Sequence, residues 1–98
     1  MGDFPGIVFK DGPTGRRAAI VAGPDIWEVI TFLAESDERG ELAIEAAAEM
    51  LALPQARIRV AIDYYTAYAA EIDAEIRAAE AASRAAEAAW RSRRELLA

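Results

Sequence analysis

The spacing of hydrophobic and polar positions divides this chain into three stretches. In the first, residues 7–10 and 16–21 are short runs with the composition of β-strands. The link between them, Asp11-Gly12-Pro13-Thr14-Gly15, has turn chemistry. These residues predict a β-hairpin. A lone hairpin is only marginally stable in water, so its strands must pack on the helices or pair with another chain.

The second stretch has apolar residues at helical spacing. Asp25 can cap a helix, and Glu28 lies three residues on, where its side chain can reach back to the Asp25 N–H. The loop at residues 36–40 ends this helix, and residues 41–52 predict another one. The buried sides of the two predicted helices are Ile26, Val29, Ile30 and Leu33 in the first and Ala43, Ala46, Ala47, Met50 and Leu51 in the second.

A tight corner at Leu53-Pro54 follows. Proline suits the first position of a helix, because its missing N–H has no partner there. Two helices joined by so short a corner predict a helix-turn-helix. Gln55, Arg57 and Arg59 then lie in the first turns of the second helix, where a recognition helix carries its nucleic-acid contacts.

The third stretch, residues 54–98, contains no strong helix breaker after its proline and is rich in Ala, Glu and Arg. It predicts one long helix. Its positions spaced alternately four and three apart have the heptad rhythm of a helix that packs along another helix. They are Ile58, Ile62, Tyr65, Ala69, Ile72, Ile76, Ala79, Ser83, Ala86, Trp90, Arg93 and Leu97.

The distal part of this helix allows two interpretations. It is either a solvated helix held by intrahelical pairs such as Glu80 with Arg84 and Glu87 with Arg91, or a binding segment. In the second interpretation apolar anchors fill a groove on another protein and arginines make the rim contacts. The residues of this predicted partner-binding set are Ile72, Ile76, Trp90, Arg91, Arg93, Arg94, Leu96 and Leu97.

Together these elements predict a mainly α fold: a short N-terminal β-hairpin, a winged-helix-like core built on the helix-turn-helix, and a long C-terminal helix. We expect residues 1–70 to form the hairpin and helix-turn-helix domain, and residues 71–98 to form a helical extension. A core of this size is modest, so a dimer or a bound partner is expected to supply part of its stability.

The composition excludes several kinds of functional site. The 98 residues include no Cys and no His, so we expect no disulfide, no metal site of the usual ligands, no cofactor and no imidazole base. The start lacks a basic region and a long apolar run, which predicts a cytoplasmic protein without a membrane partner. A net charge of −6 argues against a general nucleic-acid coat, although small basic clusters remain.

The sequence leaves more than one possible role for the basic clusters and for the acidic cluster. Gln55 and Arg57 can contact DNA while Arg16 and Arg17 act as a basic wing, or Arg57 and Arg59 can pair within the chain with Glu49 and Asp63. Three carboxylates on the long helix are expected to be solvated, and three tyrosines before them to pack in the core or a dimer, so we do not expect an enzyme. These residues are Glu71, Asp73 and Glu75, and Tyr64, Tyr65 and Tyr68.

One resemblance runs from Phe9 to Ile76. It is carried by Gly15-Arg16-Arg17, Gly23, Asp25-Ile26-Trp27-Glu28-Val29, Leu53, Ile58-Arg59-Val60-Ala61-Ile62-Asp63-Tyr64-Tyr65 and Glu71-Ile72-Asp73-Ala74-Glu75-Ile76. In this order the residues resemble short bacterial antitoxin-like proteins, a domain-of-unknown-function family of VapB-type, helix-turn-helix antitoxin relatives.

The resemblance implies a non-catalytic antitoxin. A dimeric part would bind operator DNA through positions 55, 57 and 59, and the segment from Ile72 to Leu97 would block a toxin, commonly a small RNA-cleaving nuclease. Two alternatives stay open at this point. The chain could be a homo-oligomeric helical interaction protein, or a DNA-binding regulator without a toxin.

Overall fold

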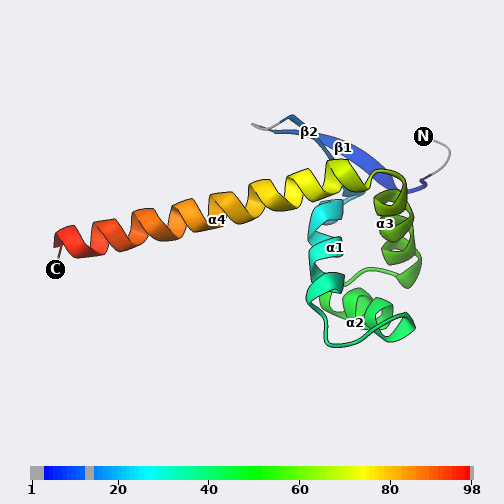
Figure 1. Cartoon of the computed structure of the whole chain (residues 1–98). Coiled ribbons are helices and arrows are strands. Elements are labelled where there is room, and N and C mark those ends of the chain that lie inside the picture. Colours follow the sequence, from blue (N-terminus) through cyan, green and yellow to red (C-terminus); the bar gives the residue numbers. More distant parts are fainter. Residues whose placement is uncertain (1–3, 13–14, 98) are drawn as a thin grey trace.

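The computed structural model describes residues 4–12 and 15–97 and contains a hairpin followed by four helices. The order is β1 (Ile7–Gly12), β2 (Gly15–Ile20), α1 (Ile26–Glu35), α2 (Glu41–Leu51), α3 (Gln55–Ala67) and α4 (Ala69–Leu97). The hairpin and the first three helices gather around the start of α4, whose remainder projects away from them (Figure 1). The mainly α fold with an N-terminal hairpin and a long last helix is confirmed.

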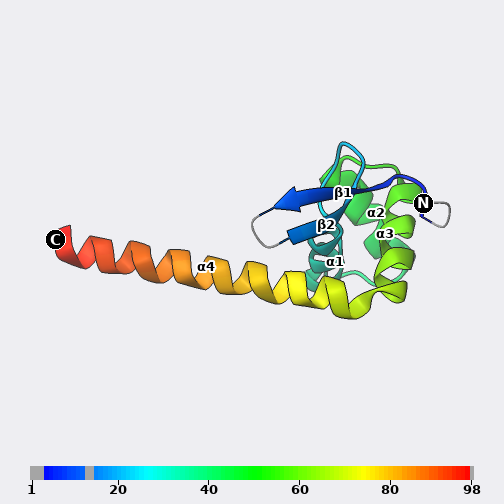
Figure 2. The same ribbon diagram turned by 90° about the horizontal axis from the view of Figure 1, so that it is seen from above.

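The hairpin is antiparallel, with Ile7 opposite Ile20 and Lys10 opposite Arg17. Its expected turn residues Pro13 and Thr14 lie outside the described residues. Ile7, Ala18 and Ile20 are buried in the hydrophobic core, so the two strands are stabilised by packing on the helices of their own chain. Figure 2 shows the hairpin beside the first part of α4.

Helix α1 begins where the sequence predicts it. The Asp25 backbone N–H donates a hydrogen bond to Glu28 Oε1 at 3.0 Å, which is one half of the expected capping box. Ile26 and Val29 are fully buried on the inner face of the helix. Ile30 and Leu33, which the pattern also placed there, are half-buried against the core.

Helices α2 and α3 are joined by a three-residue turn, Ala52, Leu53 and Pro54. Ala52 has a left-handed backbone (φ 55°), and its N–H caps the end of α2. Pro54 is extended (φ −60°, ψ 144°), so it precedes α3 rather than occupying its first position as expected. Met50 was expected on the inner face of α2 but is 71% exposed. Ile44 is buried on that face instead.

The expectation of one continuous helix from residue 54 is wrong, because the chain bends at Tyr68. Its backbone leaves the helical region (φ −131°, ψ 42°) between α3 and α4. The Phe4 ring packs edge-on against Tyr64 and Tyr68, with centroids 5.2 and 6.1 Å apart. The bend turns α4 across α1, which buries Ile72 fully in the core.

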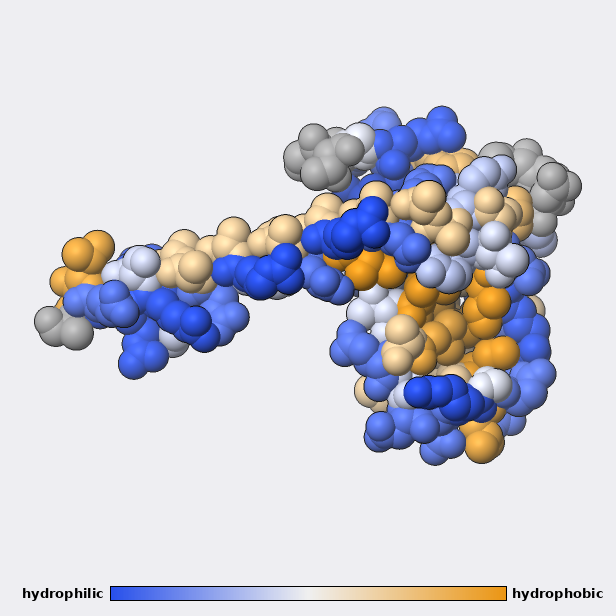
Figure 3. Space-filling model, viewed as in Figure 1, coloured by the Kyte–Doolittle hydropathy of each residue, from blue (hydrophilic) through white to orange (hydrophobic). Residues whose placement is uncertain are grey.

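The molecule is elongated, with extents of 52 × 31 × 23 Å. The core lies between the hairpin, α1, α2, α3 and the start of α4, and hydrophobic residues are visible between the helices on the face shown in Figure 3. None of the helices in residues 4–12 and 15–97 is long and apolar enough to span a membrane.

Candidate functional site

The most prominent surface feature is the arm, which we define as residues 80–97 of α4. Every residue of the arm is exposed. Three large apolar side chains lie near its end: Trp90 is 57% exposed, Leu96 86% and Leu97 75%. Surface apolar residues are ordinary when single, but Trp90 and Leu97 lie on the same face of the tip and line one pocket, and contiguous exposed apolar surface is typical of interaction sites.

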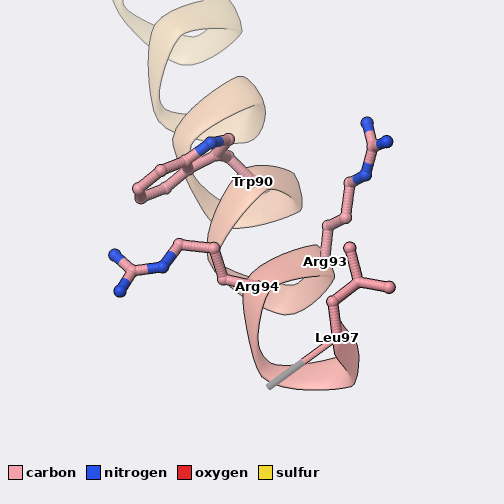
Figure 4. Close-up of a pocket in the computed structure, with 4 residues that line it drawn as sticks. All are labelled: Trp90, Arg93, Arg94 and Leu97. Carbon is pink, nitrogen blue, oxygen red and sulfur yellow. The ribbon is translucent and has the colours of Figure 1, made fainter.

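Arginines surround the apolar tip. The Arg94 guanidinium lies 4.8 Å from the centroid of the Trp90 ring, a cation–π contact. Trp90, Arg93, Arg94 and Leu97 line an open pocket of about 360 Å³ (Figure 4). Arg91 is held by Glu87 one turn back along the helix, and Arg84 lies 4.0 Å from Glu80, so both expected intrahelical pairs are confirmed. The tip thus combines flat apolar area with charged donors.

The arm continues the line of residues that packs on the core. Ile72 and Trp90 are about five helical turns apart, so their side chains leave α4 in the same direction. Ile72 is buried and Ile76 is half-buried against the core, whereas Trp90 points along the same line into solvent. One face of α4 is therefore covered by its own chain at one end and uncovered at the other.

Two residues of the predicted partner-binding set lie inside the chain's own fold. Ile72 is fully buried among the core residues, and Ile76 packs against them. Ile72 is therefore not available to a partner while the fold is intact, whereas Ile76 keeps part of its surface at a pocket between α1 and α4. The expected boundary at residues 70 and 71 also falls within a packed region, since burial on α4 extends to Ala79. The part of α4 that the fold leaves fully exposed is the arm.

The predicted DNA-binding residues on α3 are engaged differently from one another. Gln55 is exposed at the start of the helix. Arg59 makes a two-pronged ion pair with Glu41 of α2, with N···O distances of 3.1 and 2.6 Å. Hydrogen bonding from Arg59 lowers the pKa of Glu41 and raises the pKa of Arg59 itself. The partner is therefore Glu41, and not Glu49 or Asp63 as considered from the sequence.

Arg57 is held by the segment that precedes the hairpin. Its Nη1 donates to the Pro5 carbonyl oxygen at 3.2 Å. Gly6 makes this approach possible, because a Cβ at that position would lie 1.6 Å from Arg57 Nη1. Gly6 also has a positive φ of 84°, which side chains rarely adopt. The guanidinium therefore ties the N-terminal segment to α3.

The two hairpin arginines are also in contact with their own chain. Arg16 stacks over the Phe9 ring, 4.0 Å from its centroid. Arg17 Nε donates to Asp25 Oδ2 at 2.7 Å, and Lys10 Nζ reaches the other carboxylate oxygen at 3.2 Å. Burial disfavours the charged carboxylate, but the hydrogen bonds from Arg17 and Lys10 outweigh it and lower the pKa of Asp25. Asp25 thus fixes the hairpin on the start of α1.

Glu75 is the residue whose environment the sequence misses most clearly. The carboxylate was expected to be solvated, but both of its oxygens are buried and, among the described residues, have no hydrogen-bond partner. Burial raises the pKa of Glu75, and the charges of Glu71 and Asp25 raise it further, against the opposing charge of Arg17. It lies at a pocket of about 430 Å³ between β2, α1 and α4, beside Trp27.

The tyrosines were expected to pack rather than to bind bases, and Tyr64 is buried in the core. Burial, followed by the charge of Glu71, raises the pKa of Tyr64 to about 12. The Tyr65 hydroxyl donates to Asp73 at 2.8 Å, which links α3 to α4 across the bend.

Within residues 4–12 and 15–97, no group of three acidic side chains is placed to hold a metal ion. The arrangement that remains is an exposed helical arm, whose apolar tip is ringed by arginines, on a small folded core. Comparison of the chain with protein-family models, with curated proteins and with solved structures finds no match.

Proposed function

We propose that this chain is a bacterial antitoxin that acts in the cytoplasm and neutralises a protein toxin through its arm. The observation that carries the proposal is the exposure of residues 80–97 as a regular helix beyond the core. Aromatic and arginine side chains are over-represented among residues that dominate binding energy. Trp90 and the arginines beside it supply both at the end of the arm.

The mechanism would be occlusion of the toxin. Trp90, Leu96 and Leu97 would fill an apolar site, and burial of such side chains contributes about 1.5 to 3 kcal/mol each. The arginines would pair with carboxylates at the rim, and Arg91, Arg93 and Arg94 carry the charge suited to the acidic metal site of a nuclease. No chemical step on this chain is needed.

The second part of the proposal is autoregulation by binding operator DNA. It has less support than the first, because Arg17, Arg57 and Arg59 make contacts within the chain. Each guanidinium has five N–H donors, so donors remain for a phosphate after one or two are used. Gln55 and Arg16 are exposed and complete the proposed DNA surface.

The test is a pull-down from the native host with the full-length chain and with a chain ending at Ala82. The shorter chain keeps Ile72, Ile76 and Ala79 and so retains the packed part of α4. A protein retained only by the full-length chain is then expressed alone, where it should arrest growth, and together with the full-length chain, which should restore it.

Charge reversal at Arg91, Arg93 and Arg94 together should weaken this neutralisation more than tenfold, because three rim charges would then repel the toxin's carboxylates. Arg77→Glu, an exposed change on the same helix outside the arm, is the matched control and should leave neutralisation unchanged. Growth arrest that the triple variant relieves as well as the natural chain would sink the toxin-binding mechanism.

A further inference from the structure

The uncovered face of the arm is complementary to itself when two arms run antiparallel. Its positions are Ser83, Ala86, Trp90, Arg93 and Leu97, and Ala79, just before the arm, continues the same face toward the core. Consider an antiparallel pair whose two-fold axis crosses the helices at the level of residue 88. Position 79 of one copy then lies opposite position 97 of the other, 83 lies opposite 93, and 86 lies opposite 90. Each large side chain then meets a small one: Leu97 meets Ala79, Arg93 meets Ser83, and Trp90 meets Ala86.

This register agrees with the packing that antiparallel helices require. The six positions alternate at spacings of four and three, so each layer pairs one type of heptad position with the other. A two-fold axis also demands that residue i contacts residue j while j contacts i, and the pairs named above obey this condition. The face that packs on the core through Ile72 continues without interruption into these positions.

The shape of the molecule leaves room for the second arm. A pocket of about 390 Å³ lies in the elbow where α4 leaves α1, lined by Trp27, Thr31 and Glu35 of α1 and by Ala79 and Ser83 of α4. In the antiparallel register the partner's Leu97 faces Ala79, so it enters this elbow. The arm projects from the elbow for its whole length (Figures 1 and 2), so two arms can overlap fully.

Charge favours the same arrangement. The tip of the arm carries Arg91, Arg93 and Arg94. The elbow is lined by Glu35, Glu80 and Arg84, and because Arg84 pairs with Glu80 the elbow keeps one net negative charge, that of Glu35. Antiparallel pairing places the basic tip of one copy beside the acidic elbow of the other. Parallel pairing would instead place three arginines beside three arginines, which is unfavourable.

We propose that the free protein is a homodimer in which two arms pair antiparallel, with Trp90 packed on Ala86 and Leu97 seated in the elbow of the partner. The second copy covers the face that the core leaves open. This dimer does not depend on the proposed antitoxin function. A toxin that used the same face would have to displace the second copy.

The first test is sedimentation equilibrium of the purified full chain. The natural chain should be a dimer. Ala86→Glu should raise the dimer dissociation constant by at least about a hundredfold, because it places an unpaired charge against the partner's Trp90. Ala88→Glu, on the opposite side of the helix, is the matched control and should change the constant by less than about threefold.

Both substitutions are at exposed positions, so circular dichroism should show the same helix content in all three proteins at low concentration. A natural chain that is monomeric at every concentration overturns the proposal. A dimer that Ala86→Glu leaves intact overturns it as well, because another surface must then hold the copies together.

The second test fixes the direction of the arms. The chain has no cysteine, so Ala79→Cys and Leu97→Cys each carry a single thiol. On mild oxidation a mixture of the two variants should form a cross-linked dimer, whereas either variant alone should not. Cross-linking of either variant with itself would indicate parallel arms and overturn the antiparallel pairing.

Discussion

The two parts of α4 have similar compositions and different surroundings. Before residue 80 and after it, the helix is rich in alanine with interspersed charges. The first part contains Ile72, fully buried against α1, and Ile76, half-buried against the core. At the corresponding positions the arm has the small residues Ser83 and Ala86, followed by Trp90 and Leu97, which lie too far along the helix to reach the core and are exposed. The comparison teaches that helix formation follows from composition, whereas burial requires bulky apolar residues placed where the rest of the chain can reach them.

The sharpest way to test this comparison is to cut α4 at two places. A chain ending at Ala70 should lose cooperative thermal unfolding, because it lacks Ile72 and Ile76. A chain ending at Ala82 should unfold within about 3 °C of the full chain, because the removed residues are exposed. Circular dichroism at a concentration where the chain is monomeric measures both. Equal melting of the two truncated chains would show that the start of α4 is not part of the core.

Point substitutions test the same contrast on a smaller scale. Ile72→Ala should lower the free energy of unfolding by about 2 to 5 kcal/mol, because it leaves a cavity in the core. Trp90→Ala should change it by less than about 0.5 kcal/mol in the monomer, since the ring is exposed. Urea denaturation of each variant gives both values. A large loss for Trp90→Ala in the monomer would mean that the arm folds back on the core.

The smallest expected effect concerns Glu75, the buried carboxylate of α4. Its folded pKa is raised, so the folded chain binds the proton more tightly than the unfolded chain. The free energy of unfolding should therefore fall as pH rises from the ordinary glutamate pKa of 4.5 toward the folded value. Glu75→Gln should remove this slope and stabilise the chain at pH 7 by roughly 1 kcal/mol.

Glu95→Gln on the exposed arm is the control for this measurement, and it should leave the pH dependence unchanged. Asp25 has a lowered pKa, so its effect on stability has the opposite sign. Its contribution to the free energy of unfolding is present above the ordinary aspartate pKa of 3.8 and is lost as pH falls below that value. The two groups therefore act in different pH ranges. A Glu75→Gln chain that keeps the slope above pH 4.5 would contradict the buried environment of this carboxylate.

Local signals in the sequence were sufficient to locate most helices and strands. Asp25 with Glu28 marked the start of α1, and the Gly/Pro-rich link marked the hairpin, because capping and turn chemistry depend on neighbouring residues. The bend at Tyr68 had no such signal. It accompanies the packing of Phe4 on Tyr64 and Tyr68, residues far apart in the sequence, and no local pattern reports such a contact.

The candidate site divides in the same way. The apolar and basic tip of the arm is a property of consecutive residues and was read from the sequence. The sequence did not reveal which arginines make contacts within the chain. Arg59 pairs with Glu41 and Arg57 donates to Pro5, and each of these contacts joins separate elements. The burial of Glu75 also requires β2, α1 and α4 to meet.

By itself the sequence determined that most of residues 54–97 is helical and that the end of this stretch is apolar and basic, because propensity and charge act over a few neighbouring residues. Tertiary structure decided where that helix bends, which of its isoleucines are buried, and where its face becomes free. Those outcomes depend on packing between distant segments, and packing energy is set by the shapes that meet rather than by the order of residues along the chain.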